Sequence, residues 1–361
     1  MQEREKIRQL FERYRSGRCT PEEQARLHAW FNQYAGNEAH GLDDLDKLYY
    51  AKRAFKKKRL LRWFPYAAAV AILAFAFVWY VSNDSVESPK PEIVLEPNDV
   101  APGGNRATLT LADGHTIDLS EEKTGIVIGD RIMYTDGDDV WDGKLAETER
   151  TTHYLQLTTP KGGTYDITLS DGTKVWLNAE STLKYPSRFA SEERVVEIEG
   201  EAYFSVTKDS QRPFRVVSLG QQIEVLGTEF NVSAYTDENE VKTTLVEGSV
   251  KLQIHASGER MLLAPSDQSV LSGARITKRA VDVRPYIAWK DGDFNFDNTT
   301  LSDMMKQMAR WYDVDVIYES NVPDERFSGT MSRNVTLQTV LELLRISGID
   351  YHIQGNDLII K

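Results

Sequence analysis

The feature that most constrains this chain is an uncharged stretch of 20 residues, from Trp63 to Ser82, which reads WFPYAAAVAILAFAFVWYVS. At about 1.5 Å of rise per residue, a helix of this length spans about 30 Å, the thickness of the hydrocarbon core of a bilayer. A cleavable signal peptide would lie at the extreme N-terminus and be shorter. A buried core helix is the other alternative, which the basic residues before the stretch disfavour. We therefore expect one transmembrane helix over residues 63–82.

Basic residues flank this stretch on its N-terminal side only. Seven Lys and Arg residues lie between Lys52 and Arg62, whereas Asp84 and Glu87 are the first charged residues after the stretch. Lys and Arg are retained on the cytoplasmic side of a membrane. The sequence therefore predicts that residues 1–62 are cytosolic and that everything after Ser82 is exported.

The charge of the chain also divides at this stretch. Residues 1–62 carry 15 basic and 9 acidic residues and the remainder carries 28 and 46, so the formal total of −12 conceals net charges of +6 and −18. The densest basic cluster adjoins the predicted span, where anionic lipid headgroups explain it, so we expect no direct nucleic-acid binding. The one cysteine, Cys19, is on the cytosolic side, so the exported part folds without disulfides.

The cytosolic tail shows short amphipathic patterns that predict a small all-α domain. Its two aromatic stripes at helical spacing are Ile7, Leu10, Phe11 and Tyr14, and Leu27, Trp30, Phe31 and Tyr34. So short a segment buries little surface alone, so the stripes favour an interface with a partner. A helical hairpin that packs its own aromatic residues fits the same pattern. His28 and Cys19 are too few ligands for a zinc site.

The exported part begins with a linker and continues as an alternating pattern. Residues 83–101 are rich in Ser, Pro and Glu without periodicity, as is typical of a linker. Residues 102–288 alternate between polar and apolar positions, with a turn signal about every 8–12 residues, which predicts an all-β body, either a sandwich or stacked hairpins. One hairpin signal occurs twice, 58 residues apart, as LTLADG at 109–114 and ITLSDG at 167–172, each preceded by a proline and paired glycines.

Residues 289–361 change to a mixed pattern. Their two helical stripes, 36 residues apart, are Leu301, Met304, Met305 and Met308, and Leu337, Val340, Leu341 and Leu344. Thr300 and Thr336 precede the stripes as candidate N-caps, and strand-like runs flank each helix. We expect a small α+β domain of two βαβ-like halves. The methionines indicate a core rather than a binding groove.

Motifs for catalysis and cofactor binding are missing from the sequence. It contains no P-loop, GxGxxG, HExxH, GxSxG or Cys/His cluster. Glu199, Glu201 and Glu247 lie among apolar residues, but the edges of β-sheets also carry such charges. A hydrolase built on paired carboxylates is left open. We expect no enzyme activity, no cofactor and no metal.

Several motifs together resemble the FecR family of transmembrane anti-sigma regulators, in the form found in Bacteroidetes. They are TPKGG at 159–163, LSDGTKVWLN at 169–178, EGEAYF at 199–204, PF at 213–214, VLGTEFNV at 225–232, EGSV at 247–250 and DFNF at 293–296. The similarity covers the chain from its first helix to Lys361, and the run around Gly227 and Thr228 is specific. Residues 103–150 fit less well.

The resemblance implies a signalling relay. A TonB-dependent transducer in the outer membrane senses a siderophore, haem or a glycan, and its signalling domain contacts the periplasmic part of the regulator. The tail then controls an extracytoplasmic-function sigma factor through the two aromatic stripes, and so controls the uptake genes. The resemblance also implies a single-pass inner-membrane protein, with site-specific proteases as further partners.

The C-terminal domain resembles the short N-terminal modules of secretins and TonB-dependent receptors. Leu358, Ile359 and Ile360, at the chain end, form a candidate edge strand for pairing with the transducer. A strand paired wholly inside the domain fits the same residues.

Gly227 and Thr228 are a second candidate site, because some family members are self-cleaved at a Gly-Thr bond in this motif. Gly227 offers an unhindered carbonyl, and the Thr228 hydroxyl can attack it in an N-to-O acyl shift if the peptide is strained and a base accepts the proton. A bulge or a close backbone approach is the structural explanation for such a glycine, and it is the one we expect.

Two other functions are compatible with the sequence. The first is a membrane-anchored periplasmic scaffold that binds glycans or cell wall, which would leave the aromatic tail without a partner. The second, weaker alternative is a tethered hydrolase.

Overall fold

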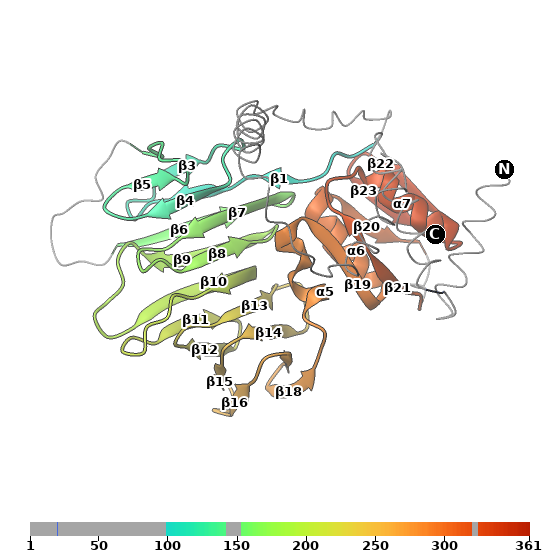
Figure 1. Cartoon of the computed structure of the whole chain (residues 1–361). Helices are drawn as coiled ribbons and strands as arrows, with labels where there is room; N and C mark the ends of the chain where they lie inside the picture. The colour runs from blue at the N-terminus through green and yellow to red at the C-terminus, as the bar shows by residue number, and fades with distance from the viewer. Residues whose placement is uncertain (1–19, 21–98, 142–152, 320–323) are drawn as a thin grey trace, which may run out of the picture. The chain divides into compact units, whose positions relative to one another are not determined.

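The computed structural model describes residue 20 and residues 99–141, 153–319 and 324–361. These residues form a β body and a C-terminal domain that contains helices (Figure 1). The aromatic stripes, the predicted span at 63–82 and the linker up to residue 98 lie outside the described residues. Among the described residues, no helix combines the length and the apolar character needed to span a bilayer.

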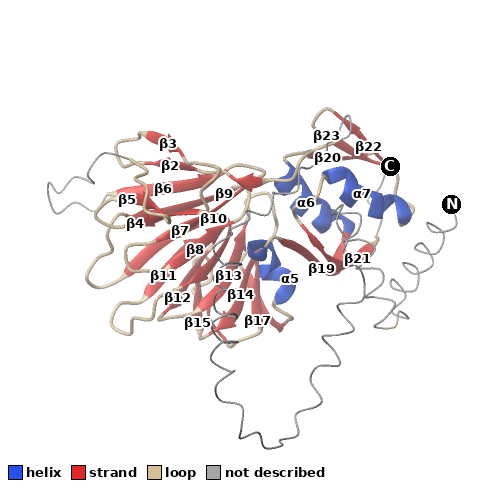
Figure 2. Ribbon diagram, turned by 45° about the horizontal axis from the view of Figure 1, so that its top comes forward, coloured by secondary structure: helices blue, strands red, loops and turns tan. Residues whose placement is uncertain are grey.

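The β body is built from eighteen short strands. In chain order they are β1 (Gly104–Asn105), β2 (Thr108–Thr110), β3 (Thr116–Asp118), β4 (Gly125–Ile128), β5 (Ile132–Tyr134), β6 (Tyr154–Thr159), β7 (Gly163–Thr168), β8 (Lys174–Leu177), β9 (Ser181–Pro186), β10 (Arg194–Ser205), β11 (Phe214–Ser218), β12 (Gln221–Val225), β13 (Glu229–Ala234), β14 (Val241–Glu247), β15 (Val250–Ile254), β16 (Arg260–Leu263), β17 (Asp267–Ser272) and β18 (Arg275–Ala280). Figure 2 shows them stacked in mostly antiparallel arrays.

Apart from β1, which pairs with β7, the strands form two sheets. One has the order β3-β2-β6-β9-β10-β11-β12-β15-β16. The other has the order β5-β4-β7-β8-β10-β13-β14-β17-β18. From β11 onward, successive hairpins alternate between the two sheets. The expected all-β body is therefore confirmed.

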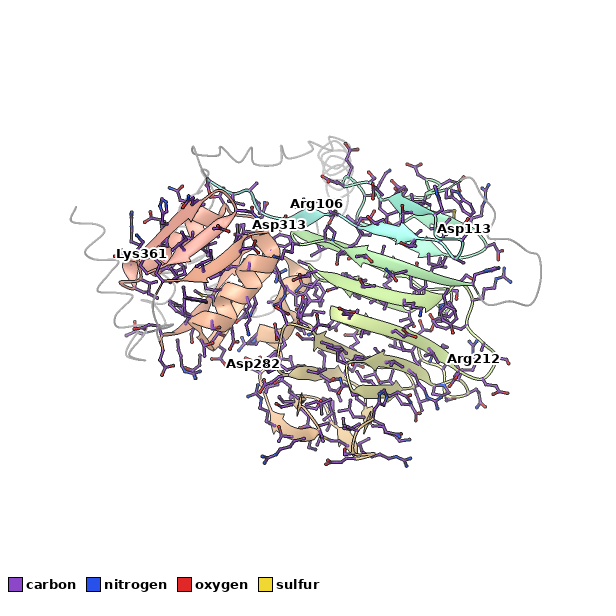
Figure 3. The ribbon with its side chains drawn as sticks, turned by 180° about the vertical axis from the view of Figure 1, so that it is seen from behind. Arg106, Asp113, Arg212, Asp282, Asp313 and Lys361 are labelled. Atoms are coloured by element: carbon purple, nitrogen blue, oxygen red, sulfur yellow. The ribbon has the colours of Figure 1, made fainter. Side chains whose placement is uncertain are left out.

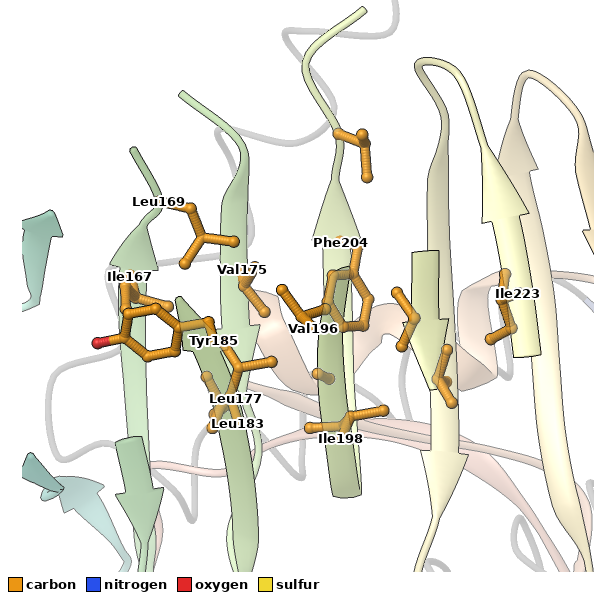
Figure 4. Packing of buried hydrophobic residues seen from close by; sticks show 14 of the residues in the cluster. Ile167, Leu169, Val175, Leu177, Leu183, Tyr185, Val196, Ile198, Phe204 and Ile223 are labelled. Carbon is orange, nitrogen blue, oxygen red and sulfur yellow. The ribbon is translucent and has the colours of Figure 1, made fainter. Parts of the chain in front are cut away.

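Alternating apolar residues build the core of this body. Side chains such as Ile167, Val175, Leu183, Val196 and Ile223 are at most 1% exposed and belong to one cluster (Figure 4). They come from five strands, β7 to β10 and β12, because every second residue of a strand points to the same face. Burying one such side chain contributes about 1.5–3 kcal/mol. The apolar residue at every second position of each strand thus explains why the sheets pack against each other.

Strand β10 belongs to both sheets. Its first half pairs with β9 and β11, and its second half, from Gly200, pairs with β8 and β13. Gly200 has a φ of +88°, and a Cβ placed on it would lie 2.4 Å from Ser181 Oγ and 2.6 Å from the Glu180 carbonyl oxygen. Only glycine tolerates both the conformation and the contact.

Both copies of the repeated hairpin form, as β2–β3 and β7–β8. In each turn an aspartate accepts a backbone N–H two residues on, at 2.9 Å: His115 to Asp113, and Thr173 to Asp171. Only Asp171 also pairs with a buried cation, Arg194, at 2.7 Å. The glycines before the two copies pair with each other, because β1 lies parallel to β7.

The C-terminal domain holds the remaining elements. In chain order they are α5 (Arg284–Ile287), a 3₁₀ turn (Ala288–Asp291), β19 (Asp293–Thr300), α6 (Leu301–Tyr312), β20 (Asp315–Tyr318), β21 (Arg326–Ser332), α7 (Leu337–Ile346), β22 (Tyr351–Gln354) and β23 (Asp357–Ile360). Helices α6 and α7 carry the two predicted stripes. Met304, Met305 and Met308 are at most 3% exposed, which confirms that the methionines are core residues.

Strand pairing in this domain differs from the expected βαβ halves. β19 pairs with β21 in one sheet, and β23 pairs with β20 and β22 in another. The two strands that flank α6 are therefore in different sheets, and the same is true of α7. Helix α6 contacts β19 and β21 of the first sheet and β20 of the second.

The two helices are also capped differently. The Thr300 hydroxyl accepts the Asp303 N–H at 3.1 Å at the start of α6. Thr336 makes no such bond at the start of α7, so its prediction as a side-chain cap is wrong. Its hydroxyl contacts Thr339 Oγ1 at 3.1 Å instead, at the position where α6 has the carboxylate of Asp303.

Candidate functional site

The predicted contacts with a sigma factor lie outside the described residues. All eight stripe residues, Ile7, Leu10, Phe11, Tyr14, Leu27, Trp30, Phe31 and Tyr34, precede residue 99. Their role stays a prediction.

Leu358, Ile359 and Ile360 do not form an edge strand, so this prediction is wrong. They belong to β23, which pairs with β20 on one side and with β22 on the other. Leu358 and Ile360 are at most 1% exposed. Because both rows of backbone groups of β23 are already paired, no incoming strand can add to it.

Gly227 and Thr228 lie where the chain passes from β12 in one sheet to β13 in the other, rather than inside one strand. A Cβ on Gly227 would lie 2.8 Å from Lys208 Cα, so a close backbone approach accounts for the glycine. Thr228 is 5% exposed and donates its hydroxyl proton to the Ser249 carbonyl at 3.0 Å. This acceptor is a carbonyl and cannot act as the base that an acyl shift requires.

The most elaborate polar site lies where the C-terminal domain meets the β body. Arg310, near the end of α6, stacks 3.7 Å from the ring centroid of Tyr235. Its guanidinium pairs with Asp237 at 2.6 Å, Glu238 at 2.8 Å and Glu180 at 3.3 Å. The Arg310 side chain is only 7% exposed. Because all four partners belong to the β body, this arginine connects the C-terminal domain to the β body.

A second set of contacts, the Glu201 network, lies beside Arg310. Arg333 donates to Asn178 Oδ1 at 2.9 Å, and Asn178 Nδ2 donates to Glu201 at 2.7 Å. Asn231 Nδ2 donates to the other oxygen of Glu201 at 2.8 Å. Trp289 Nε1 in turn donates to Asn231 Oδ1 at 3.2 Å. This chain of bonds joins β8, β10 and β13 to the C-terminal domain.

Burial dominates the electrostatics of this network. It raises the pKa of Glu201, although the bonds from Asn231 and Asn178 and the charge of Arg333 act in the opposite direction. It lowers the pKa of Arg333 to about 10, so that Arg333 is still a cation at neutral pH. Arg333 also packs over the rings of Phe294 and Trp311. Burial thus disfavours the charged form of each group.

A cleft of about 650 Å³ lies at the same junction. It is lined by both arginines, by Glu201 and by aromatic rings such as Trp289 and Tyr286. The described residues contain no group of three or more His, Cys, Asp or Glu side chains suited to a metal ion. The arrangement is suited to holding two domains in one relative position.

Glu201 does not lie at a sheet edge, so the sheet-edge explanation fails for this residue. The residue next to it, Ala202, pairs with Leu177 of β8 and with Val232 of β13, so β10 is an internal strand there. A carboxylate beside the apolar run Ala202 to Phe204 was the available signal, because a buried carboxylate must be hydrogen-bonded. The residues around Arg310 and Arg333 in the sequence do not indicate that these arginines lie at a domain junction.

Two family models match the chain. The one described as FecR protein matches residues 156–251 of the β body, and the one described as FecR, C-terminal matches residues 293–360. The β body and the α+β domain that follows it thus match, in this order, the two domains of a FecR-type anti-sigma regulator. The chain belongs to the FecR family.

Two crystal structures are similar to the chain. Both are of a protein from Parabacteroides distasonis ATCC 8503, provisionally assigned as an anti-sigma factor, at 1.65 and 2.50 Å resolution. Each is 30% identical to the chain with a TM-score of 0.53, over 57% of this chain and 98% of that chain. Among curated proteins, none matches the chain.

The raised pKa of Glu201 predicts a pH dependence of stability. The protonated carboxyl is favoured in the folded state, so this residue stabilises the fold most below its unfolded pKa of about 4.3, and the contribution is lost as the pH rises through the folded pKa. Glu201→Gln, which does not titrate, also places an NH₂ group against one of the two Asn donors, at a cost of about 1–3 kcal/mol. The wild type should therefore gain stability over this variant as the pH falls.

Urea unfolding of the full chain from about pH 7 to about pH 4.5 measures this difference. Glu199→Gln, two residues away and exposed, is the matched control and should follow the wild type. A difference between the wild type and Glu201→Gln that stays constant, or shrinks, with falling pH would contradict the prediction.

Proposed function

We propose that the chain is a transmembrane anti-sigma factor that relays a signal from an outer-membrane TonB-dependent transducer to a cytosolic extracytoplasmic-function sigma factor. It would control the transcription of genes for uptake of iron, haem or glycans. The observation that carries the proposal is the match of both FecR models, in order, after a basic-flanked uncharged 20-residue stretch. The chain would then span the inner membrane once, with its N-terminus in the cytosol and its C-terminus in the periplasm.

The cytosolic contact is proposed for the aromatic stripes. Trp30 and Phe31 lie in a segment of 62 residues that is too short to bury many aromatic rings by itself. Large aromatic residues at the centre of an interface carry much of its binding free energy. This supports a sigma factor as the partner that covers them.

The periplasmic contact is proposed for the outer strands of the sheet that contains β23. Among the described strands, β20 and β22 each pair only with β23, so each has one open edge. Ile317 of β20 is 45% exposed. An open edge with an exposed aliphatic side chain suits strand addition by a partner. The proposed receiver therefore moves from β23 to β20 or β22.

The alternative of a glycan-binding or cell-wall-binding scaffold gains little from the cleft. Glycan sites offer free aromatic faces, but the Tyr235 ring is covered by Arg310 and the Trp311 ring packs against Arg333. The polar groups of the Glu201 network are bonded to one another. These contacts favour a domain junction over a carbohydrate site.

We further propose that the chain is not an enzyme and that the Gly227–Thr228 bond stays intact, because the Thr228 hydroxyl donates to a carbonyl. An immunoblot of the purified wild type and of Thr228→Ala should show one full-length band for each. Two fragments from the wild type, divided after Gly227, together with an intact variant would establish self-cleavage instead.

The sigma-factor contact predicts a loss of affinity on truncating one ring. Trp30→Ala should weaken binding of the full-length chain to its sigma factor by well over tenfold, because a buried aromatic at an interface centre contributes about 2 kcal/mol or more. Titration calorimetry with candidate extracytoplasmic-function sigma factors measures this. Gln33→Ala, off the stripe, is the control. Unchanged affinity in both Trp30→Ala and Phe31→Ala would mean that the rings pack within the tail.

The receiver and the topology can be tested in one experiment. A photo-crosslinking residue in place of Ile317 should capture an outer-membrane receptor in intact cells, which requires position 317 to be periplasmic. The control is position 262 in the β body, where Leu262 lies on the outer strand β16 and is 64% exposed. Capture of a cytosolic protein would overturn the topology, and capture only from position 262 would move the receiver to the β body.

A further inference from the structure

The segment Asp99–Asn105, which we call the strap, contacts both parts of the exported region. At its N-terminal end, the Val100 carbonyl accepts the Leu337 N–H and the Asp99 carboxylate accepts the Gln338 N–H, each at 3.0 Å. Leu337 and Gln338 are the first two residues of α7. The strap therefore satisfies two of the free N–H groups at the start of that helix.

Comparison of α7 with α6 shows that the strap supplies the N-terminal cap that α7 does not receive from its own Thr336. Thr300 caps α6 from within its own sequence, whereas Thr336 leaves α7 without a side-chain cap. The cap of α7 comes instead from Asp99, which is 239 residues away along the chain. A helix cap is an interaction that shifts a local opening equilibrium by about fivefold or more. The start of α7 and the strap should thus open together.

The C-terminal end of the strap is held by the β body. The Gly104 N–H donates to the Gly162 carbonyl at 2.9 Å, and β1 then continues parallel to β7. The Gly162 N–H donates to the Arg310 carbonyl at 2.6 Å, so the same residue contacts both the strap and α6. Arg106, labelled in Figure 3, donates to the same Gly162 carbonyl at 3.1 Å.

Gly103 lies very close to neighbouring segments of the chain. A Cβ placed on it would lie 2.5 Å from the Gly162 carbonyl oxygen and 2.8 Å from Cε3 of Trp311. Trp311 in turn donates its Nε1–H to the Arg333 carbonyl at 2.9 Å. The strap thus lies against Trp311, whose ring is itself bonded to Arg333 of the domain junction.

We propose that the strap is the conformational device that couples the C-terminal domain to the chain beside the predicted span. In the sequence it follows residues 83–98, which connect it to that span. Displacing the C-terminal domain removes the α7 and Trp311 contacts at once, and the strap is then held only by its short pairing with β7. The role in signalling rests on the proposed function, whereas the coupling itself rests on these contacts.

Hydrogen exchange of the full-length chain in detergent, read by mass spectrometry, tests the coupling. Gly103→Ala should speed exchange about tenfold both in the strap and in the first turn of α7, because the added Cβ pushes the strap off Trp311. Gly104→Ala is the matched control, since its Cβ meets nothing within 4 Å, and it should leave both regions unchanged. Slow exchange in β10 reports that the β body is folded.

A second pair of variants tests the other end. Asp99→Ala should speed exchange about fivefold at Leu337 and Gln338 and also at Gly104, whereas Asp99→Asn, which caps as well as Asp, should not. Faster exchange confined to the substituted end in both Gly103→Ala and Asp99→Ala overturns the coupling. If Gly103→Ala does not fold, the Asp99 pair decides alone.

Transcription from a sigma-dependent promoter, measured in parallel, separates the two claims. If neither variant speeds hydrogen exchange at both ends, the proposed coupling between the strap and α7 is overturned, whatever the transcription shows. Coupled exchange with unchanged transcription in Gly103→Ala counts against the proposed function and leaves the strap in place.

Discussion

The passage of β10 from one sheet to the other at Gly200 is the constraint on which the rest of the structure depends. The Cβ of any other residue would collide with Ser181 and with the Glu180 carbonyl, and the left-handed φ would add strain. The first half of β10 pairs with β9 and β11 in one sheet, and the second half pairs with β8 and β13 in the other. The strand therefore connects the two sheets. The same crossing places Glu201 directly after the bend, at the junction with the C-terminal domain.

Buried polar contacts then give that junction its specificity. Arg333 reaches Glu201 through Asn178, and Arg310 lies between Tyr235 and three carboxylates. Such groups lose hydration when they are buried, so their net contribution to stability is small, but leaving one of them unpaired is costly. An apolar interface would tolerate sliding, whereas these directional bonds are satisfied in one docked position.

Local patterns predicted individual elements well and their partners poorly. The duplicated Asp-Gly turns marked both hairpins, and the period of the methionine stripe marked α6, because these signals depend on residues close in sequence. The pairing of β23 on both sides and the Asp99 cap of α7 involve residues far apart in the chain. No local signal shows which strand edge is already paired. For this reason the edge strand and the Thr336 cap were mispredicted.

Local sequence patterns were enough to identify the uncharged stretch at 63–82, the all-β character of the body, the two C-terminal helices and the family. These follow from hydropathy, from periods of 2 and 3.6 residues, and from short motifs, all of which can be read along one dimension. The folded chain was needed to show that Glu201 is on an internal strand, that Arg310 and Arg333 join two domains, and that Asp99 caps a distant helix. The physical reason is that burial and hydrogen-bond partnership depend on which segments meet in space, and here the partners lie up to 239 residues apart.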